Sequence, residues 1–346
     1  MAYISFQPND FFSTTLYTGT GSTQTISGVG FEPNFTWVKD RDATEAPTLF
    51  DSVRGATKRL YSSSTADEST SAVSLTAWNS DGFAIGSGGE VNTSGDDFVS
   101  WNWKSNTTSG LSGGTITPTA YSINATTGVG IYRYNGTGSA GTIAHGLGVA
   151  PDIVICKSLI HSGLNWAVYT SSAANPTTET LYLNADNSIG GSSTFWNSTS
   201  PTSTLFSLGT GDDVNGSSKQ YIMYAFAKKQ GFSHLGSFFG SGRTHGTFVY
   251  CGLKPSLIFI KAITNSGGWY MYDAKRGYNG ARQYLQANAT SAGDTNEGNF
   301  GIDLNANGFK IHGTNNGINN HNETYQVIAF AEEAIVSSNG KAATAR

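Results

Sequence analysis

The chain contains one pattern of residues in three copies. In each copy a proline stands six residues before a lysine, with a short apolar run rich in β-branched and aromatic residues between them. The three pairs are Pro33 and Lys39, Pro151 and Lys157, and Pro255 and Lys261. A Gly-x-Gly turn precedes each proline by 14 or 15 residues. Such self-similarity at a fixed period is the signature of a repeat architecture, so fold and function are predicted for one module and for an array of three.

Each copy also closes in the same way. A Val-Asn or Ile-Asn pair is followed, twelve positions after it begins, by an aromatic residue. The pairs begin at Val91, Val214 and Ile318, and the aromatic residues are Trp103, Phe226 and Phe330. These anchor residues keep the same spacing in all three copies. A match by chance is therefore excluded, even in a chain rich in turn-forming residues.

The repeats divide the 346 residues into three modules, each of roughly 100 residues. The predicted divisions are an N-terminal attachment segment (1–15), a first repeat (16–104), a Ser/Thr/Gly-rich linker (105–128), a second repeat (129–229), a third repeat (230–335) and a C-terminal tail (336–346). The linker predicts that the first module is placed more freely than the other two.

The pattern within each copy predicts strands and no helix of any length. The runs before the lysines are continuously apolar, which indicates burial on both faces. The closing segment alternates instead, with Val99, Trp101 and Trp103 on one core-facing side. The prediction is an all-β fold of three tandem antiparallel β-sandwich or jelly-roll-like modules, and the sequence leaves these two topologies open. Each lysine is expected to lay its stem on apolar surface and reach water with its ammonium group.

The composition disfavours several classes of function. Charged residues make up 13% of the chain and the formal net charge is -4, so no nucleic-acid partner is predicted. No apolar run is long enough to span a membrane, and the first residues do not resemble a secretory signal. Cys156 and Cys251 are expected to be buried and unpaired. We therefore expect a protein that folds in a cytoplasm, without membrane insertion.

Residue types with catalytic chemistry form no recognisable arrangement. Acidic pairs such as Asp96 and Asp97 are sequence neighbours, whereas a glycosidase needs two carboxyl groups that face each other across a sugar. The six histidines lack metal-binding spacing. The sequence therefore predicts no catalytic residue, no metal site, no cofactor and no enzymatic activity.

One polar motif is a candidate for ligand binding. An Asp-x-x-Arg-Gly sequence holds Asp51 and Arg54 in the first copy and Asp273 and Arg276 in the third, whereas the middle copy lacks it. An aspartate and an arginine three residues apart can pair across a turn, and the glycine allows a left-handed backbone. A structural staple is favoured over a ligand site, with both hypotheses open.

Four tryptophans form the other candidate ligand-binding set. They lie in or beside polar, loop-like stretches and are Trp78, Trp166, Trp196 and Trp269. Exposed tryptophans beside Asn and Asp are a common means of gripping neutral glycans, by stacking on sugar faces. Single exposed aromatics are equally ordinary in β-sandwiches, so the pattern favours neither hypothesis.

The chain resembles a known family over nearly its whole length. The resemblance is carried by the segments GVGFEPNFTWVKDRD, DSVRGATKRLYSSSTADE, NSDGFAIGSGGEVNTSGDDFVSWNWK and GTIAHGLGVAPDIVICKS. They are similar to a tandem-repeat β-domain family of tail-fibre or virion-surface proteins from marine and other environmental bacteriophages. The family supplies no catalytic residues, and residues 299–316 depart from its pattern.

This resemblance implies a non-enzymatic structural protein of a phage particle. We expect a virion location, with assembly in the host cytoplasm and action outside the cell. The favoured hypothesis is a tail fibre or receptor-binding component that adheres to host surface glycans, attached to other virion proteins by its N-terminal segment. A homo-oligomer is expected, with a trimer favoured. The alternatives are a capsid decoration or tail-scaffold protein that binds only virion partners, and a polysaccharide depolymerase.

Overall fold

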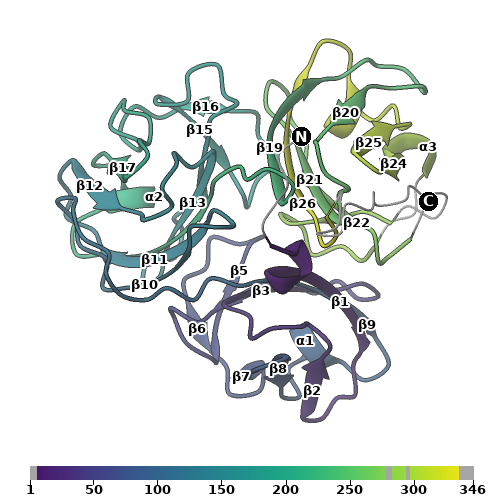
Figure 1. Cartoon of the computed structure of the whole chain (residues 1–346), viewed down its shortest axis with the longest axis horizontal. Coiled ribbons are helices and arrows are strands. Elements are labelled where there is room, and N and C mark those ends of the chain that lie inside the picture. Colours follow the sequence, from purple (N-terminus) through teal and green to yellow (C-terminus); the bar gives the residue numbers. More distant parts are fainter. Residues whose placement is uncertain (1–5, 278–282, 294–296, 335–346) are drawn as a thin grey trace.

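Three β-modules surround a common axis (Figure 1). The computed structural model describes residues 6–277, 283–293 and 297–334. The fold is all-β with antiparallel sheets, as predicted. The first module holds β1 to β9, the second β10 to β18 and the third β19 to β26. The C-terminal tail 336–346 lies outside the described residues.

Each module contains one large antiparallel sheet, and the three sheets share a strand order. The first is β1 (Phe12–Thr18), β9 (Asp97–Trp103), β3 (Phe35–Asp40), β4 (Thr48–Asp51), β5 (Lys58–Tyr61) and β6 (Ser69–Thr70). The second is β10 (Ala120–Asn124), β11 (Val129–Asn135), β18 (Gln220–Phe226), β13 (Ile153–Ser158), β14 (Ala167–Thr170), β15 (Glu179–Tyr182) and β16 (Gly190–Gly191). The third is β19 (Ser233–Phe239), β26 (Thr324–Phe330), β21 (Leu257–Ala262), β22 (Trp269–Asp273) and β23 (Leu285–Gln286).

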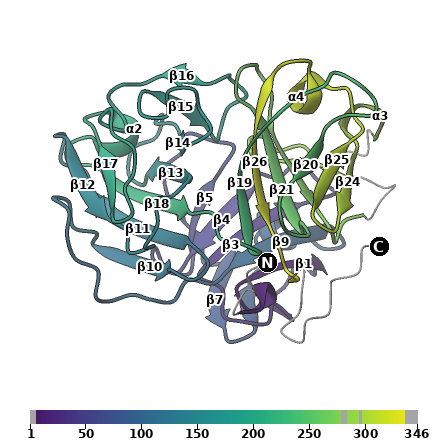
Figure 2. The ribbon, with the colours of Figure 1, turned by 45° about the horizontal axis from the view of Figure 1, so that its top comes forward.

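A small sheet covers the outer face of each large sheet, as Figure 2 shows for the third module. The small sheets are β2 (Gln24–Ser27), β8 (Gly82–Ile85) and β7 (Leu75–Asn79); β12 (Gly141–Ala144) and β17 (Leu205–Leu208); and β20 (Phe248–Tyr250), β25 (Gly308–Ile311) and β24 (Ile302–Asn305). The helices of the described residues are single turns: η1 (Pro8–Asp10), α1 (Gly89–Asn92), α2 (Asp212–Asn215), α3 (Glu297–Phe300) and α4 (Asn316–Asn319). Each module is thus a sandwich of unequal layers, with its own core between them.

The asparagine of each Val-Asn or Ile-Asn anchor ties a short helix to the Gly-x-Gly turn. Asn92, at the end of α1, is fully buried. Its Oδ1 accepts a hydrogen bond from the Thr20 amide at 2.7 Å, and its Nδ2 donates to the Gly86 carbonyl at 2.7 Å. Asn215 and Asn319 make the equivalent bonds in the other modules. A buried side-chain amide that both accepts from and donates to backbone groups at this reach suits asparagine, which explains why the anchor recurs.

The inner faces of the three large sheets form one shared core. The closing aromatics Trp103, Phe226 and Phe330 meet there, with ring centroids 5.4 to 6.2 Å apart. Around them lies a small cavity of about 20 Å³, which is lined by aromatic and aliphatic side chains. The closing strands are buried on both faces because one face meets this shared core and the other meets the module's own core.

The three strand-ending lysines are buried, so the prediction that their ammonium groups reach water is wrong. Lys39, Lys157 and Lys261 are at most 1% exposed. Burial lowers the pKa of each to about 8, which leaves them largely protonated at neutral pH. A buried ammonium group needs acceptors on every side, and these are backbone carbonyl groups.

Each lysine takes some of those acceptors from another module. Lys157 Nζ donates to the Leu164 carbonyl at 2.7 Å in its own module and to the Thr65 carbonyl at 2.9 Å in the first. Lys261 Nζ donates to the Asp186 and Asn187 carbonyls of the second module. Lys39 Nζ closes the ring with the Thr290 carbonyl of the third, at 3.1 Å. The cycle of contacts locks all three modules together.

Two predicted divisions differ from the structure. Residues 105–128 are no free linker, because β10 lies within them and pairs with β11, and Ile116 and Ile123 are buried in the second core. The attachment segment 1–15 is also too long, because Phe12–Thr18 form β1 and Phe12 lies in the shared core. Residues 1–5 lie outside the described residues. The first module is therefore as firmly placed as the others.

We predict that Lys157→Met lowers the free energy of unfolding by about 2 kcal/mol, because two buried carbonyl groups lose their donor. Urea titration at pH 7 measures the change. The matched control is Lys58→Met, where a 37% exposed side chain loses an ion pair with Glu68 and a hydrogen bond to Thr70, and less than about 1 kcal/mol. Equal losses in the two variants would contradict a clamp role for Lys157.

Candidate binding surface on the third module

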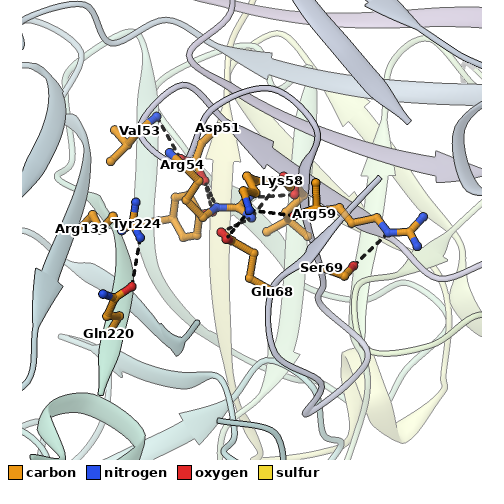
Figure 3. A network of polar contacts seen from close by, with 12 residues as sticks. Asp51, Val53, Arg54, Lys58, Arg59, Glu68, Ser69, Arg133, Gln220 and Tyr224 are labelled. Carbon is orange, nitrogen blue, oxygen red and sulfur yellow. Dashed lines mark hydrogen bonds and ion pairs between the residues drawn. The ribbon is translucent and has the colours of Figure 1, made fainter. Parts of the chain in front are cut away.

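The first Asp-x-x-Arg turn is a closed, buried pair at the interface between the first and second modules (Figure 3). Arg54 Nε lies 2.5 Å from Asp51 Oδ2, and both side chains have no exposed area. The other module contributes Tyr224, whose hydroxyl donates to Asp51 Oδ2 at 2.6 Å. The guanidinium also donates to the Leu49 carbonyl at 2.9 Å. The carboxylate has no face left for a ligand.

The second copy of this turn occupies the interface between the third and first modules. Arg276 Nε lies 2.6 Å from Asp273 Oδ2, which also accepts from Trp101 Nε1 at 3.1 Å. In the middle module Thr170 takes the aspartate's place and donates to Gln326 Oε1 of the third module. All three equivalent positions therefore make a cross-module contact, so a staple explains both the motif and its loss.

The charges around Arg54 extend this network within the first module. Glu68 lies 3.6 Å from Arg54 Nη1 and 3.7 Å from Lys58 Nζ. Arg59 pairs with the buried Glu90 at 2.5 Å and donates to Ser69 at 3.0 Å. Because each acid faces a cation, these groups neutralise one another and hold β5 and β6 in place. Among the described residues, no cluster of three His, Cys, Asp or Glu side chains forms a metal site.

Three of the four candidate tryptophans are buried, so the prediction that they are exposed for sugar stacking is wrong. Trp166 Nε1 donates to the Tyr61 and Ser64 carbonyls of the first module, both at 3.1 Å. Trp269 Nε1 donates to the Tyr182 carbonyl of the second at 2.9 Å. Trp196 packs inside the core of the second module, and Trp78 is half-buried against the core of the first module. Two of the four are thus interface residues that happen to follow polar loops.

Cys156 and Cys251 are buried and unpaired, as predicted. No helix in the described part of the chain is both long and apolar enough to cross a membrane.

The exposed aromatic residues lie elsewhere, on the third module. Phe239 is 69% exposed, Tyr250 65% and Phe248 45%. Phe239 ends β19, while Phe248 and Tyr250 project outward from β20 on either side of the buried Val249. The Thr247 hydroxyl donates to the Phe239 carbonyl at 2.9 Å, which brings the ends of these two strands together. Exposed large aromatics on adjacent strand edges commonly mark an interaction site.

The equivalent strands of the other modules carry small side chains. Val249 faces Phe309, as Ile26 faces Phe83 and Ile143 faces Phe206. By this register Phe248 and Tyr250 correspond to Thr25 and Ser27 in the first module and to Thr142 and Ala144 in the second. Because two modules fold without aromatics at these positions, the pair Phe248 and Tyr250 is unnecessary for the scaffold.

The edge strands beside these aromatics are covered to different degrees in the three modules. In the second module residues 105–128 cover the same side: β10 pairs with β11, and the Thr115 and Ile116 amides donate to the Thr142 carbonyl at 2.9 Å. In the first module the Thr14 amide at the edge of β1 donates to Glu332 Oε1 at 2.5 Å. Burial raises the pKa of this Glu332 carboxyl. Within the described ranges, β19 and β20 have no strand on their outer edges.

The sequence did not predict this surface. It is defined by Phe239, Phe248, Tyr250 and the outer edges of β19 and β20. The signal was present in the three-residue run Phe248–Tyr250, where a buried residue stands between two large apolar ones. Among the aligned segments Thr25–Ser27, Thr142–Ala144 and Phe248–Tyr250, the aromatic pair stands in the third copy alone.

The comparisons with known proteins concern the chain as a whole. A family model described as "Domain of unknown function (DUF7483)" matches residues 7–334. No curated protein and no solved structure matches the chain.

We predict that Asp51→Ala lowers the free energy of unfolding by about 3 to 5 kcal/mol, because Arg54 and Tyr224 stay buried without their partner. Asp10→Ala, which removes an exposed carboxylate, serves as the control and is expected to change it by less than about 0.5 kcal/mol. Thermal and urea unfolding both report the difference. A stable Asp51→Ala protein would reopen the ligand-site hypothesis.

Proposed function

Since the chain belongs to the family of the domain of unknown function DUF7483, we propose its role from its own residues: a non-enzymatic structural component of a bacteriophage particle that binds a partner through its third module. The observation that carries the proposal is the exposed aromatic surface of the third module. The other candidate site residues are buried in interfaces or cores, except Trp78, which is half-buried. Three interlocked modules with one exposed aromatic surface suit a structural protein that binds a partner.

The particle itself is proposed from the sequence. The resemblance to phage tail-fibre and virion-surface proteins and the low content of charged residues, 13%, support a surface that works outside the cell. The glycan-adhesion hypothesis loses most of its residue basis, because Trp166, Trp196 and Trp269 are buried. Of the two structural hypotheses, a component bound to virion partners is therefore the better supported, with a glycan-binding fibre as its rival. The proposed trimer of chains is tested by light scattering.

We predict that immunogold labelling finds the chain at a defined place on purified phage particles. An even coat over the capsid identifies a decoration protein, and label confined to the tail identifies a tail component. Particles without label would overturn the proposal.

The rival fibre hypothesis has its own measurement. A glycan-binding fibre predicts that purified chain competes with phage for adsorption to host cells, whereas a component that binds only virion partners leaves adsorption unchanged. Release of reducing ends from host polysaccharide by the purified chain would contradict the non-enzymatic assignment.

A further inference from the structure

We propose that the open side of the third module binds an extended segment of another polypeptide, which adds as a strand to the outer edge of β19. This inference deepens the proposed function by naming the kind of partner, and it rests on that function for its setting in a phage particle. Strand addition to an exposed sheet edge is a general mode of peptide recognition, in which backbone bonds supply affinity and side-chain contacts supply specificity.

The second module shows how such a side is covered. β10 adds to the outer edge of β11, the strand equivalent to β19. The same segment also bonds to the edge of β12 through its Thr115 and Ile116 amides, and Thr115 Oγ1 accepts from the Thr142 amide at 2.8 Å. Ile116 and Ile123 enter the gap between the two sheets and are about 5% exposed. One segment thus covers the outer edges of β11 and β12 and fills the end of the core between the two sheets.

The third module presents the same edges without that segment. The bond from the Gly240 amide to the Glu323 carbonyl sets the register of β19 on β26, so the backbone groups of Leu235 and Ser237 point to the outer edge. The bond from the Cys251 amide to the Asn307 carbonyl likewise places the backbone groups of Phe248 and Tyr250 on the outer edge of β20. An edge with exposed apolar side chains is a site of unwanted pairing unless something covers it.

The connection before the third module is too short to supply a cover. The second module receives its cover from the long segment 105–128 between β9 and β11, whereas only residues 227–232 separate β18 from β19. In the first module Glu332 caps one outward amide of β1, and the small residues Thr25 and Ser27 stand where the third module has aromatics, so its edge offers a strand fewer apolar contacts. The connection 227–232 therefore supplies no cover, and we assign that place to a strand of another polypeptide.

The chemistry of the surface indicates the chemistry of that strand. Ser237, Phe239, Thr247, Phe248 and Tyr250 carry no charge, as is also true of the segment Gly114–Asn124 that covers the second module. The expected partner segment is uncharged, rich in Ser and Thr, and carries apolar residues spaced like Ile116, Tyr121 and Ile123. The aromatics on β19 and β20 would pack against those apolar side chains.

A peptide of residues 111–126, labelled with a fluorophore, tests the proposal on the full chain. The chain's own copy already fills the second module, so the peptide can reach only open edges. We expect saturable 1:1 binding by fluorescence anisotropy, with a scrambled peptide as the negative probe.

Two matched proline variants localise the binding. Ser237→Pro removes an outward amide of β19, a position where an edge strand tolerates proline, and is expected to weaken binding at least about tenfold. Leu16→Pro removes the equivalent outward amide of β1 and should leave binding unchanged. Phe248→Thr with Tyr250→Ser, which installs the first module's residues, should also weaken binding, and circular dichroism and unfolding curves establish that each variant is folded.

Several outcomes overturn the inference. These are no binding up to about 1 mM peptide, equal binding by the Ser237→Pro variant, or loss of binding in the Leu16→Pro variant alone. Binding of host polysaccharide that is lost in the Phe248→Thr/Tyr250→Ser variant but kept in Ser237→Pro would assign the surface to a glycan instead. If the chain binds the peptide but is absent from phage particles, the proposed function is rejected and the strand-binding site is retained. If the chain is found on particles but does not bind the peptide, the strand-binding site is rejected and the proposed function is retained.

Discussion

The inner face of each large sheet is apolar and has no cover within its own module. The small sheets cover only the outer faces, so the inner faces must bury one another. Trp103, Phe226 and Phe330 are in contact where the three inner faces meet. Burial of apolar area is the dominant favourable term in folding, and here a large part of it becomes available only when three modules assemble. The unit of stability is therefore the whole ring.

The polar groups at the interfaces give this apolar contact a defined geometry. A shared core of aliphatic and aromatic side chains would tolerate small rotations between modules, whereas a buried ammonium or carboxylate group tolerates very few arrangements of its partners. Lys39, Lys157 and Lys261 take carbonyl groups from the neighbouring module, and Asp51 and Asp273 take a hydroxyl and an indole N–H. Residues that looked like binding candidates therefore specify how the modules meet.

The sequence predicted the strands well because their cause is local. The continuous apolar runs before the lysines and the alternation of Val99, Trp101 and Trp103 each reflect burial that neighbouring residues report. Burial of Lys157 was not predictable in this way, since its acceptor Thr65 lies 92 residues away in another module. The burial of Trp166 and Trp269 is unpredictable for the same reason, because the surface that covers them belongs to a different repeat. The open side of β19 is not predictable from neighbouring residues either, because it depends on which segments cover the equivalent strands in space.

The contact between Lys39 and the Thr290 carbonyl spans 251 residues and makes the ring close late. During synthesis the first module leaves the ribosome with its inner face uncovered and its lysine without one of its acceptors. At elongation rates of about 5 to 20 residues per second, the last module follows some tens of seconds behind. Throughout that interval the apolar inner faces are available to other nascent copies of the chain. We therefore expect the arrival of the third module to compete with encounters between nascent chains, and the rate of synthesis to affect the yield of correctly formed protein.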